Sequence, residues 1–142
     1  MTINQIQDEI IEEFDGLTDW MDRYAYIIEL GNTLPDFPDD KKTPENLIEG
    51  CQSRVWITAD RVPEGRIRFE ADSDALIVKG IVSLLLRVLS DHTPDEIHES
   101  ELYFIDRIGL RDHLSPTRSN GLVAMVKQIN NYARAYKMID SK

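Results

Sequence analysis

"RVWITADRVPEGRIRFEADSDALIVKGIVSLLLRVLSD", residues 54–91, decides the fold because its hydrophobic period changes midway. Apolar and polar residues alternate over 54–61 and again over 65–72, on the two sides of a Pro-Glu-Gly turn. A period of two around such a turn predicts an antiparallel hairpin with one buried face.

The second half of the stretch predicts a helix. Lys79, Ser83 and Arg87 recur every four residues in an otherwise apolar run, which is typical of a helix with one narrow polar stripe. Ser73 is the expected N-cap of this helix. Asp74 would then occupy its first position, where the helix dipole favours a carboxylate.

Two helices are expected before the hairpin. Thr2 and Gln5 have the spacing of a capping box, apolar residues then recur at helical intervals, and Asp15-Gly16 ends the run. A second helix is expected after Thr18.

A proline-rich loop and a short extended segment lead into the hairpin. The loop, "PDFPDDKKTP", covers residues 35–44 and must lie on the surface, because proline lacks a donor and fixes φ. Leu47 and Ile48 follow as the extended segment, so we expect a small antiparallel sheet of about three strands.

Helices are also expected after residue 91. A short one begins at Thr93-Pro94, another covers 101–110, and a loop, "HLSPTRSNG", covers 113–121. A long C-terminal helix follows, with Ser119 or Asn120 as its cap. The sequence therefore predicts one α+β domain over residues 1–142, with the small sheet covered by several helices.

The composition limits the partners that the chain can have. Its 16 Lys and Arg against 26 Asp and Glu give a formal charge of −10, which repels nucleic acid and anionic lipid and favours a basic protein surface. The N-terminus lacks the pattern of a secretory signal, and the longest apolar run is interrupted by Arg87. We expect a cytoplasmic protein that binds neither nucleic acid nor membrane.

The residue types exclude several chemistries. The single cysteine and three scattered histidines, His92, His98 and His113, do not supply the ligand pairs of a zinc site or the roughly four thiolates of an iron–sulfur cluster. The chain has no phosphate-binding glycine motif. We expect this chain to bind no metal and no cofactor of its own.

The single thiol, Cys51, has small and polar neighbours. Gly50 precedes it, Gln52 and Ser53 follow it, and the predicted strand begins directly afterwards. A loop of this kind can present a side chain on a rigid frame. An isolated thiolate can accept the outer sulfur of another protein's persulfide by thiol exchange, without a metal or a second cysteine.

Two other readings of Cys51 stay open. With His113 as base, Cys51 could be the nucleophile of a stand-alone hydrolase or acyl transferase. Alternatively Cys51 is an inert buried residue, and the chain is an acidic binding module.

Four stretches of the sequence resemble the SufE family. They are "YIIELGNTLP" at 26–35, "GCQSRVW" at 50–56, "ADSDALIVKG" at 71–80 and "HLSPTRSNGL" at 113–122. The four stretches follow the family order with family-like separations, and one of them contains the sole cysteine.

The resemblance implies a fold and a function. The fold would be SufE-like, similar to the IscU-type cluster scaffolds. Cys51 would accept persulfide sulfur from a cysteine desulfurase of the SufS type, stimulate that enzyme, and pass the sulfur to an iron–sulfur scaffold of the SufB type. The pyridoxal phosphate would belong to the desulfurase. The chain would not be an enzyme by itself, and the resemblance does not decide between monomer and homodimer.

Roles for the other matched residues are also expectations. Gly50, Gln52 and Ser53 either shape the cysteine loop or form an ordinary turn. Arg118, expected just before the cap of the last helix, is either a surface cation or a stabiliser of a thiolate or persulfide anion. Asp74 and His113 are expected to have structural roles.

Overall fold

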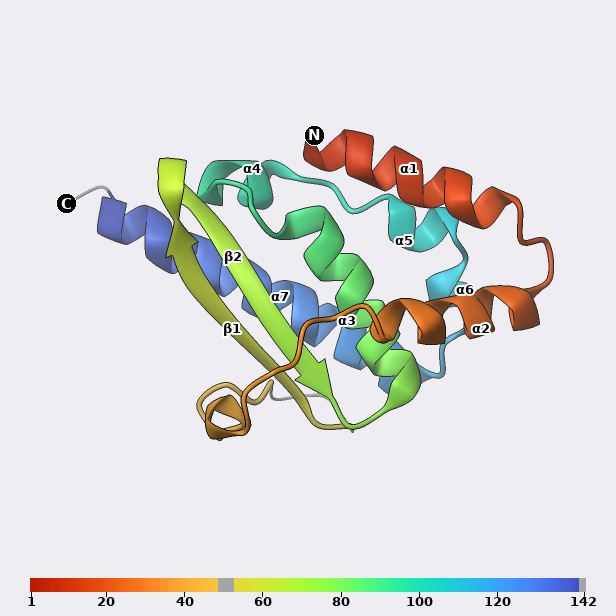
Figure 1. Ribbon diagram of the computed structural model, residues 1–142. Coiled ribbons are helices and arrows are strands. Elements are labelled where there is room, and N and C mark those ends of the chain that lie inside the picture. Colours follow the sequence, from red (N-terminus) through yellow and green to blue (C-terminus); the bar gives the residue numbers. More distant parts are fainter. Residues whose placement is uncertain (49–52, 141–142) are drawn as a thin grey trace.

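The computed structural model describes residues 1–48 and 53–140 (Figure 1). The described residues form two strands, several helices and two short 3₁₀ turns. In chain order these are α1 (Ile3–Asp15), α2 (Trp20–Gly31), η1 (Asp39–Lys41), β1 (Val55–Val62), η2 (Pro63–Gly65), β2 (Arg66–Ser73), α3 (Leu76–Leu89), α4 (Pro94–Glu99), α5 (Phe104–Arg107), α6 (Leu110–His113) and α7 (Pro116–Asp140).

The predicted hairpin is confirmed. β1 and β2 pair antiparallel from Val55 opposite Ser73 to Val62 opposite Arg66. The alternate residues Val55, Ile57, Ile67 and Phe69 are almost completely buried. In the turn, Glu64 and Gly65 have φ of 69° and 70°, a left-handed conformation that glycine adopts without a steric cost and that is uncommon for other residues.

The segment expected as a third strand contributes only one bridge among the described residues, from Leu47 to Trp56. The N–H groups of Asn46 and Leu47 donate to the carbonyls of Thr43 and Pro44. The chain is therefore still in a turn when it reaches the edge of β1, so the ladder does not extend to the residues before Asn46.

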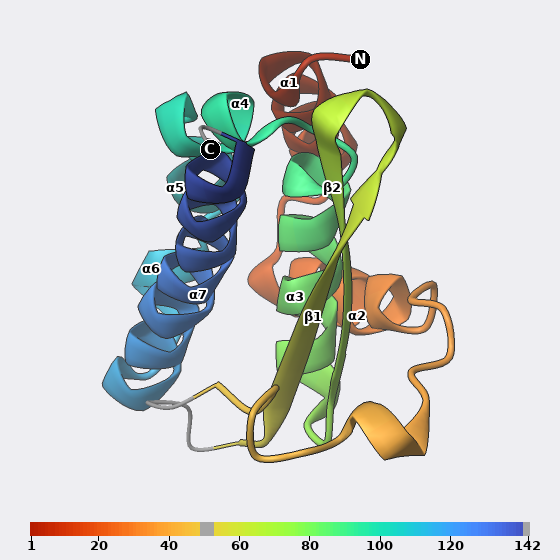
Figure 2. The same cartoon turned by 90° about the vertical axis from the view of Figure 1, so that its left-hand side faces the viewer.

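α3 is the central helix, and the prediction of its polar stripe is confirmed. Lys79 pairs with Asp72 at 3.4 Å and Arg87 with Glu9 at 3.0 Å, while the Ser83 hydroxyl donates to the carbonyl of Gly80, one turn earlier, at 2.7 Å. Figures 1 and 2 show α3 between the α1–α2 pair and α7, with the hairpin packed against it.

The predicted cap of α3 is wrong. The N-cap is Ala75, which has no side-chain cap, and the helix begins at Leu76. Ser73 is instead the last residue of β2, opposite Val55. Because the strand continues through residue 73, the helix starts two positions later than the side-chain pattern indicates, and Asp74 lies outside it.

Two glycines allow α2 and α3 to lie unusually close together. A Cβ on Gly80 would lie 2.0 Å from the backbone oxygen of Ile27, and a Cβ on Gly31 would lie 2.9 Å from the backbone nitrogen of Gly80. Neither position can accept a side chain without moving a helix backbone.

The N-terminal helices agree with the predictions. α1 has the Thr2–Gln5 capping box and ends at Asp15. A polar network joins it to α2 and α3: Glu13 accepts hydrogen bonds from Tyr26 and from Arg87. The hydrogen bond from Arg87 lowers the pKa of Glu13 although burial opposes this. Burial, with a further contribution from Glu13, raises the pKa of Tyr26 to about 12.

The C-terminal region differs from the prediction in its helix bounds. The single helix expected over 101–110 is wrong, because α5 ends at Arg107 and Gly109, at a φ of 81°, separates it from α6. The short helix after Thr93 is confirmed with its Thr93–Glu96 capping box. The predicted loop over 113–121 and the predicted caps at Ser119 and Asn120 are wrong, because α7 already begins at Pro116. Proline suits the first helical position, where its missing N–H would have no partner. The hydroxyl of Ser115 accepts the N–H of Arg118 at 3.3 Å, as an N-cap does.

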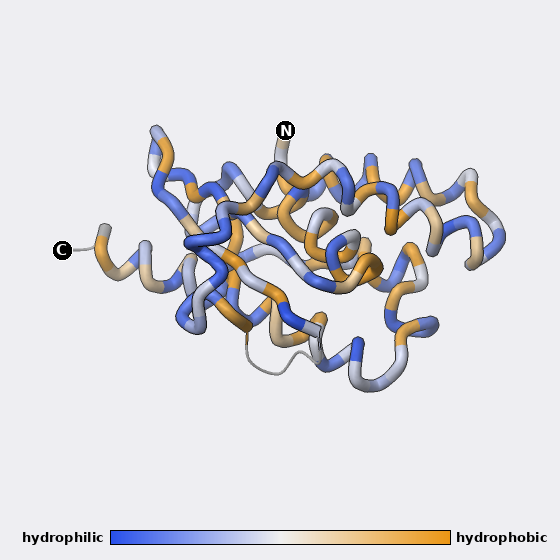
Figure 3. Tube along the Cα trace, turned by 60° about the horizontal axis from the view of Figure 1, so that its bottom comes forward, coloured by the Kyte–Doolittle hydropathy of each residue, from blue (hydrophilic) through white to orange (hydrophobic). Residues whose placement is uncertain are grey.

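α7 lies on the same side of α3 as β1 and contacts that strand through two tyrosines (Figure 2). The hydroxyl groups of Tyr132 and Tyr136 donate to the carbonyls of Ile57 and Ala59 on β1, at 3.1 and 3.0 Å. Hydrophobic and hydrophilic residues alternate along many of the helices and strands in Figure 3, because most elements bury only one face in the common core. The central helix α3 is the exception, since most of its residues are buried. This arrangement fixes the ends of the hairpin, one of which leads to Cys51.

Candidate functional site

The site must be assembled around its predicted nucleophile, since Cys51, Gly50 and Gln52 lie outside the described residues. The nearest described residues on either side are Ile48 and Ser53.

The two flanks of the cysteine segment are joined to each other. The N–H of Ile48 donates to the carbonyl of Val55 at 2.8 Å, and the N–H of Ile57 donates to the carbonyl of Asn46 at 3.0 Å. Both flanks therefore lie at the beginning of β1, and the sheet holds them together.

Asp74 and Ser73 hold the backbone of Arg54. The Asp74 carboxylate accepts the N–H of Arg54 at 3.0 Å, and the carbonyl of Arg54 accepts the Ser73 hydroxyl at 2.8 Å. The expectation that Asp74 is the first residue of a helix is wrong. Its observed role is to fix the chain three residues after Cys51, and we call this set of three residues the Arg54 clamp.

A small cavity lies beside the same flank. Its volume is about 80 Å³, and its walls bring Ser53 together with residues of α3 and of the first turns of α7. The lining residues are Ser53, Val78, Ile81, Thr117, Arg118, Gly121 and Met125. The structure thus brings together two of the predicted site residues, Ser53 and Arg118, which are far apart in the sequence.

The sequence predicted that Arg118 lies just before the cap of the last helix. The structure places it in the first turn of α7 instead. Its side chain is exposed and forms no ion pair with a described residue. A guanidinium at the N-terminus of a 25-residue helix provides a positive potential, which stabilises a thiolate or a persulfide anion that approaches it.

Sequence reasoning missed Thr117 and Gly121 as lining residues. Gly121 is three residues from Arg118 and four from Thr117, spacings at which residues share one face of a helix. The signal was present in Ser115-Pro116, which is a helix start when proline is read as the first helical residue.

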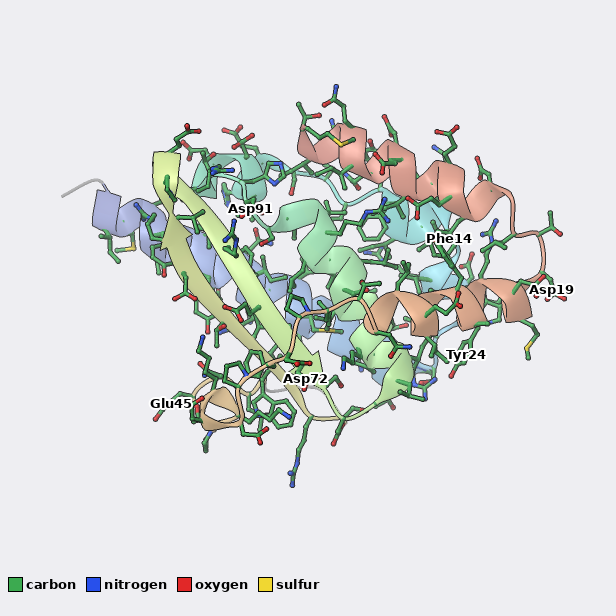
Figure 4. The ribbon with its side chains drawn as sticks, in the orientation of Figure 1. Phe14, Asp19, Tyr24, Glu45, Asp72 and Asp91 are labelled. Atoms are coloured by element: carbon green, nitrogen blue, oxygen red, sulfur yellow. The ribbon has the colours of Figure 1, made fainter. Side chains whose placement is uncertain are left out.

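An ion-pair network fixes the strand end next to the Arg54 clamp. Asp72 pairs with Lys42 at 3.2 Å and with Lys79 at 3.4 Å, and Figure 4 shows Asp72 near the end of β2. Burial alone would raise the pKa of Asp72, but the Ser73 N–H and the two lysines together lower it. Lys42 also lies 5.5 Å from the centre of the Trp56 ring. These contacts hold the proline-rich loop against the sheet.

His113 has a structural environment. Its ring stacks on Trp20 at 4.2 Å between centroids and 12° between planes, and its Nδ1 lies 2.9 Å from the carbonyl of Gly109, which requires that this nitrogen carry the proton. His113 does not line the cavity that contains Ser53 and Arg118. These contacts give it a packing role between α2 and α6.

Within residues 1–48 and 53–140, no three His, Cys, Asp or Glu side chains are grouped as metal ligands would be. Over the same residues, no helix combines the length and the apolar character needed to cross a membrane.

Comparisons with known proteins agree with this architecture. A family model described as "SufE: Fe-S metabolism associated domain" matches residues 8–133. An uncharacterised SufE-like protein of Rhizobium etli is 46% identical over 131 residues, covering 89% of this chain and 88% of its own. One of Rhizobium meliloti is 40% identical over 130 residues, with 89% and 93% covered. A hypothetical protein of Thermus thermophilus, 22% identical, shares the fold with a TM-score of 0.75 over 94% of this chain and 96% of its own.

Proposed function

This chain belongs to the SufE family of domains associated with Fe–S metabolism, and from that membership we propose that Cys51 is a persulfide sulfur acceptor. The observation that carries the proposal is the family match over residues 8–133, which includes the only cysteine of the chain. The donor is a cysteine desulfurase that forms the persulfide on its own cysteine, with pyridoxal phosphate bound to that enzyme.

The proposed step is a thiol exchange. The Cys51 thiolate attacks the outer sulfur of the donor persulfide, a new S–S bond forms on Cys51, and the donor's S–S bond breaks. The electron pair of the broken bond leaves with the donor cysteine as a thiolate. No external oxidant or reductant is consumed, and the desulfurase is free for another cycle, which is how the acceptor stimulates it.

The described residues support this step in two ways. The Arg54 clamp fixes the chain beside Cys51 to the rigid end of the hairpin. Arg118 and the N-terminus of α7 supply a positive potential beside Ser53, and the anionic forms of the acceptor are favoured there. Asp74 is in this proposal a positioning residue, and Arg118 an electrostatic one. Gly50 and Gln52, on the two sides of Cys51, shape the loop that presents the thiol.

The sulfur then leaves for an iron–sulfur scaffold complex. The outer sulfur of the Cys51 persulfide is attacked by a scaffold thiolate, and Cys51 returns to its thiolate form by the same exchange. In this series of sulfur transfers, the chain is an accessory protein and binds no cofactor itself. A single cysteine that must stay reduced between cycles suits the cytoplasm.

Intact-mass spectrometry tests the proposal directly. The protein is incubated with a cysteine desulfurase and free cysteine, and Cys51 is expected to gain the mass of one sulfur atom, whereas Cys51→Ser gains none. Asp60→Ala is the control, because it keeps the thiol and changes an exposed carboxylate of β1 that does not line the cavity. An unmodified Cys51 together with unchanged desulfurase turnover would rule the proposal out.

A further inference from the structure

Cys51 is reached from two flanks of equal length. It lies three residues after Ile48 and three residues before Arg54. Three residues span at most about 11 Å, so the position of each flank limits where the thiol can go. The Arg54 clamp holds the flank after Cys51. The flank before Cys51 needs an attachment of its own.

The flank before Cys51 is the end of the proline-rich loop. The backbone of the loop end joins β1 at Asn46 and Ile48, which bond to Ile57 and Val55. Further back in the loop, the ring of Phe37 is buried. Residues 38–45, between these two attachments, are two prolines and six polar residues. This part of the loop must therefore be held by polar contacts.

Lys42 supplies such a contact to both strands of the hairpin. Its ammonium nitrogen lies 3.2 Å from Oδ2 of Asp72 on β2 and 5.5 Å from the centre of the Trp56 ring on β1. Trp56 and Asp72 are opposite each other in the hairpin. Lys42 also lies 3.4 Å from Asp39, within the loop itself. The hydrogen bond with Asp72 is the main reason why the pKa of Lys42 is raised.

Asp72 is a firm attachment point for the loop. Its side chain is only 16% exposed. Its Oδ1 accepts the N–H of Ser73 at 2.8 Å and lies 3.4 Å from the ammonium nitrogen of Lys79 on α3. The carboxylate thus connects the loop, β2 and α3. The neighbouring pair of Lys41 with Glu70 is longer, at 3.8 Å, and its side chains are 38% and 32% exposed.

Three consecutive residues hold both flanks of the cysteine. Asp72 holds the flank before Cys51 through Lys42. Ser73 and Asp74 hold the flank after it through Arg54. Both attachments are therefore made where β2 ends, although they use different side chains and can be removed one at a time.

We propose that Lys42 is a positioning residue for the sulfur transfer: its ion pair with Asp72 fixes the flank before Cys51, and with it the approach of the thiol to the donor persulfide. This role rests on the proposed function of Cys51, and it assigns Lys42 no contact with the sulfur atoms. Placement matters for such a step, because a displacement of about 1 Å at the reacting atoms can lower a rate by about a hundredfold.

Stimulation of the desulfurase separates placement from docking. Turnover is measured at increasing concentrations of this protein. Lys42→Met and Asp72→Asn should each lower the maximal stimulated turnover about three- to tenfold, while the half-saturating concentration changes by less than about twofold. Lys42→Arg should keep most of the turnover. Asp39→Asn is the matched control, because it removes the partner of Lys42 in the loop and leaves the partner on β2.

Hydrogen exchange reports the attachment without any desulfurase. The amides of Ile48 and Ile57 join the loop end to β1, and they should exchange faster in Lys42→Met and Asp72→Asn than in the wild type and Asp39→Asn. Urea unfolding checks that the variants are folded. If Asp72→Asn fails to fold, Lys42→Met carries the test, since it changes a loop residue and leaves the contact of Asp72 with Lys79.

Four outcomes overturn the proposal. They are unchanged maximal turnover in Lys42→Met, an equal loss in Asp39→Asn, unchanged exchange at Ile48 and Ile57, and a higher half-saturating concentration at unchanged maximal turnover. The last of these would assign Lys42 to a contact with the desulfurase. A wild-type protein that gains no sulfur would refute the proposed function of Cys51 and this role with it, whereas the exchange rates would still show whether the ion pair holds the flank.

Discussion

Single residues beside Cys51 have roles that follow from their contacts. Arg118 contributes charge to the cavity next to Ser53, and Asp74 holds the backbone of Arg54. The first residue acts on the ionisation of the thiol and the second on its placement, so substitutions at the two positions should give different results.

Arg118→Ala should slow the alkylation of Cys51 by iodoacetamide at neutral pH by about three- to tenfold, because a smaller fraction of the thiol is ionised without the nearby cation. Persulfide loading by the desulfurase should slow in parallel, and Arg118→Lys should restore most of both rates. Arg107→Ala removes another exposed, unpaired cation and is the control. Equal alkylation rates in wild type and Arg118→Ala would contradict the electrostatic role.

Asp74→Ala removes the acceptor of the Arg54 N–H. We expect a loss of about 1 kcal/mol in the free energy of unfolding, measured with urea, and faster hydrogen exchange at the Arg54 amide. Asp60→Ala, an exposed carboxylate on β1, should change neither. If the Arg54 amide keeps its protection in Asp74→Ala, the carboxylate does not hold this strand end.

Helices and strands were predicted correctly from the sequence where a single local pattern determines them. The hairpin, α1, α3 and the short helix α4 follow from local periodicity and from start signals that involve only neighbouring residues. The start of α3 was wrong because pairing with β1 extends β2 through Ser73. The start of α7 was wrong because Ser-Asn-Gly resembles a loop, whereas the helix is capped earlier by Ser115.

The site was predicted less completely than the elements. The meeting of Ser53 with Arg118 and the stacking of His113 on Trp20 join segments far apart in the chain. No local pattern contains such contacts, since they result from the way in which α3, α6 and α7 pack. Cys51 itself could be singled out because it is the sole thiol.

The crossing of α2 and α3 gives a stability prediction at the scale of elements. Gly80→Ala should lower the free energy of unfolding by about 2 kcal/mol, because overpacking against the Ile27 carbonyl outweighs the better helix propensity of alanine. Gly16→Ala is the matched control, since a Cβ there meets nothing within 4 Å. Urea unfolding distinguishes the two. Equal midpoints would show that the helices separate without cost.

At the scale of the whole molecule, the α1–α2–α3 network ties stability to pH. The pKa of Glu13 is lowered in the folded protein, first by its hydrogen bond with Arg87. A carboxyl group of this kind binds fewer protons when folded, so its contribution is complete above its ordinary pKa of 4.5 and is lost as the pH falls below that value.

Glu13→Gln should therefore lower stability at pH 7 and flatten the decrease of stability below pH 4.5. The free energy of unfolding, measured with urea from pH 7 to pH 3, tests this. Glu12→Gln changes an exposed neighbour on α1 and should leave the wild-type profile unchanged. An identical acid profile in Glu13→Gln would show that the network does not link the three helices energetically.

The two tyrosine hydroxyls that α7 places on β1 bear on aggregation of the protein at high concentration. In a sheet of two strands, the outer side of β1 would be a template on which a foreign strand could add and seed aggregation. The carbonyls of Ile57 and Ala59 already have hydroxyl donors, and Asn46 and Ile48 bond to the beginning of the strand. Loss of both hydroxyls would thus leave these two carbonyls open to pairing with a foreign strand.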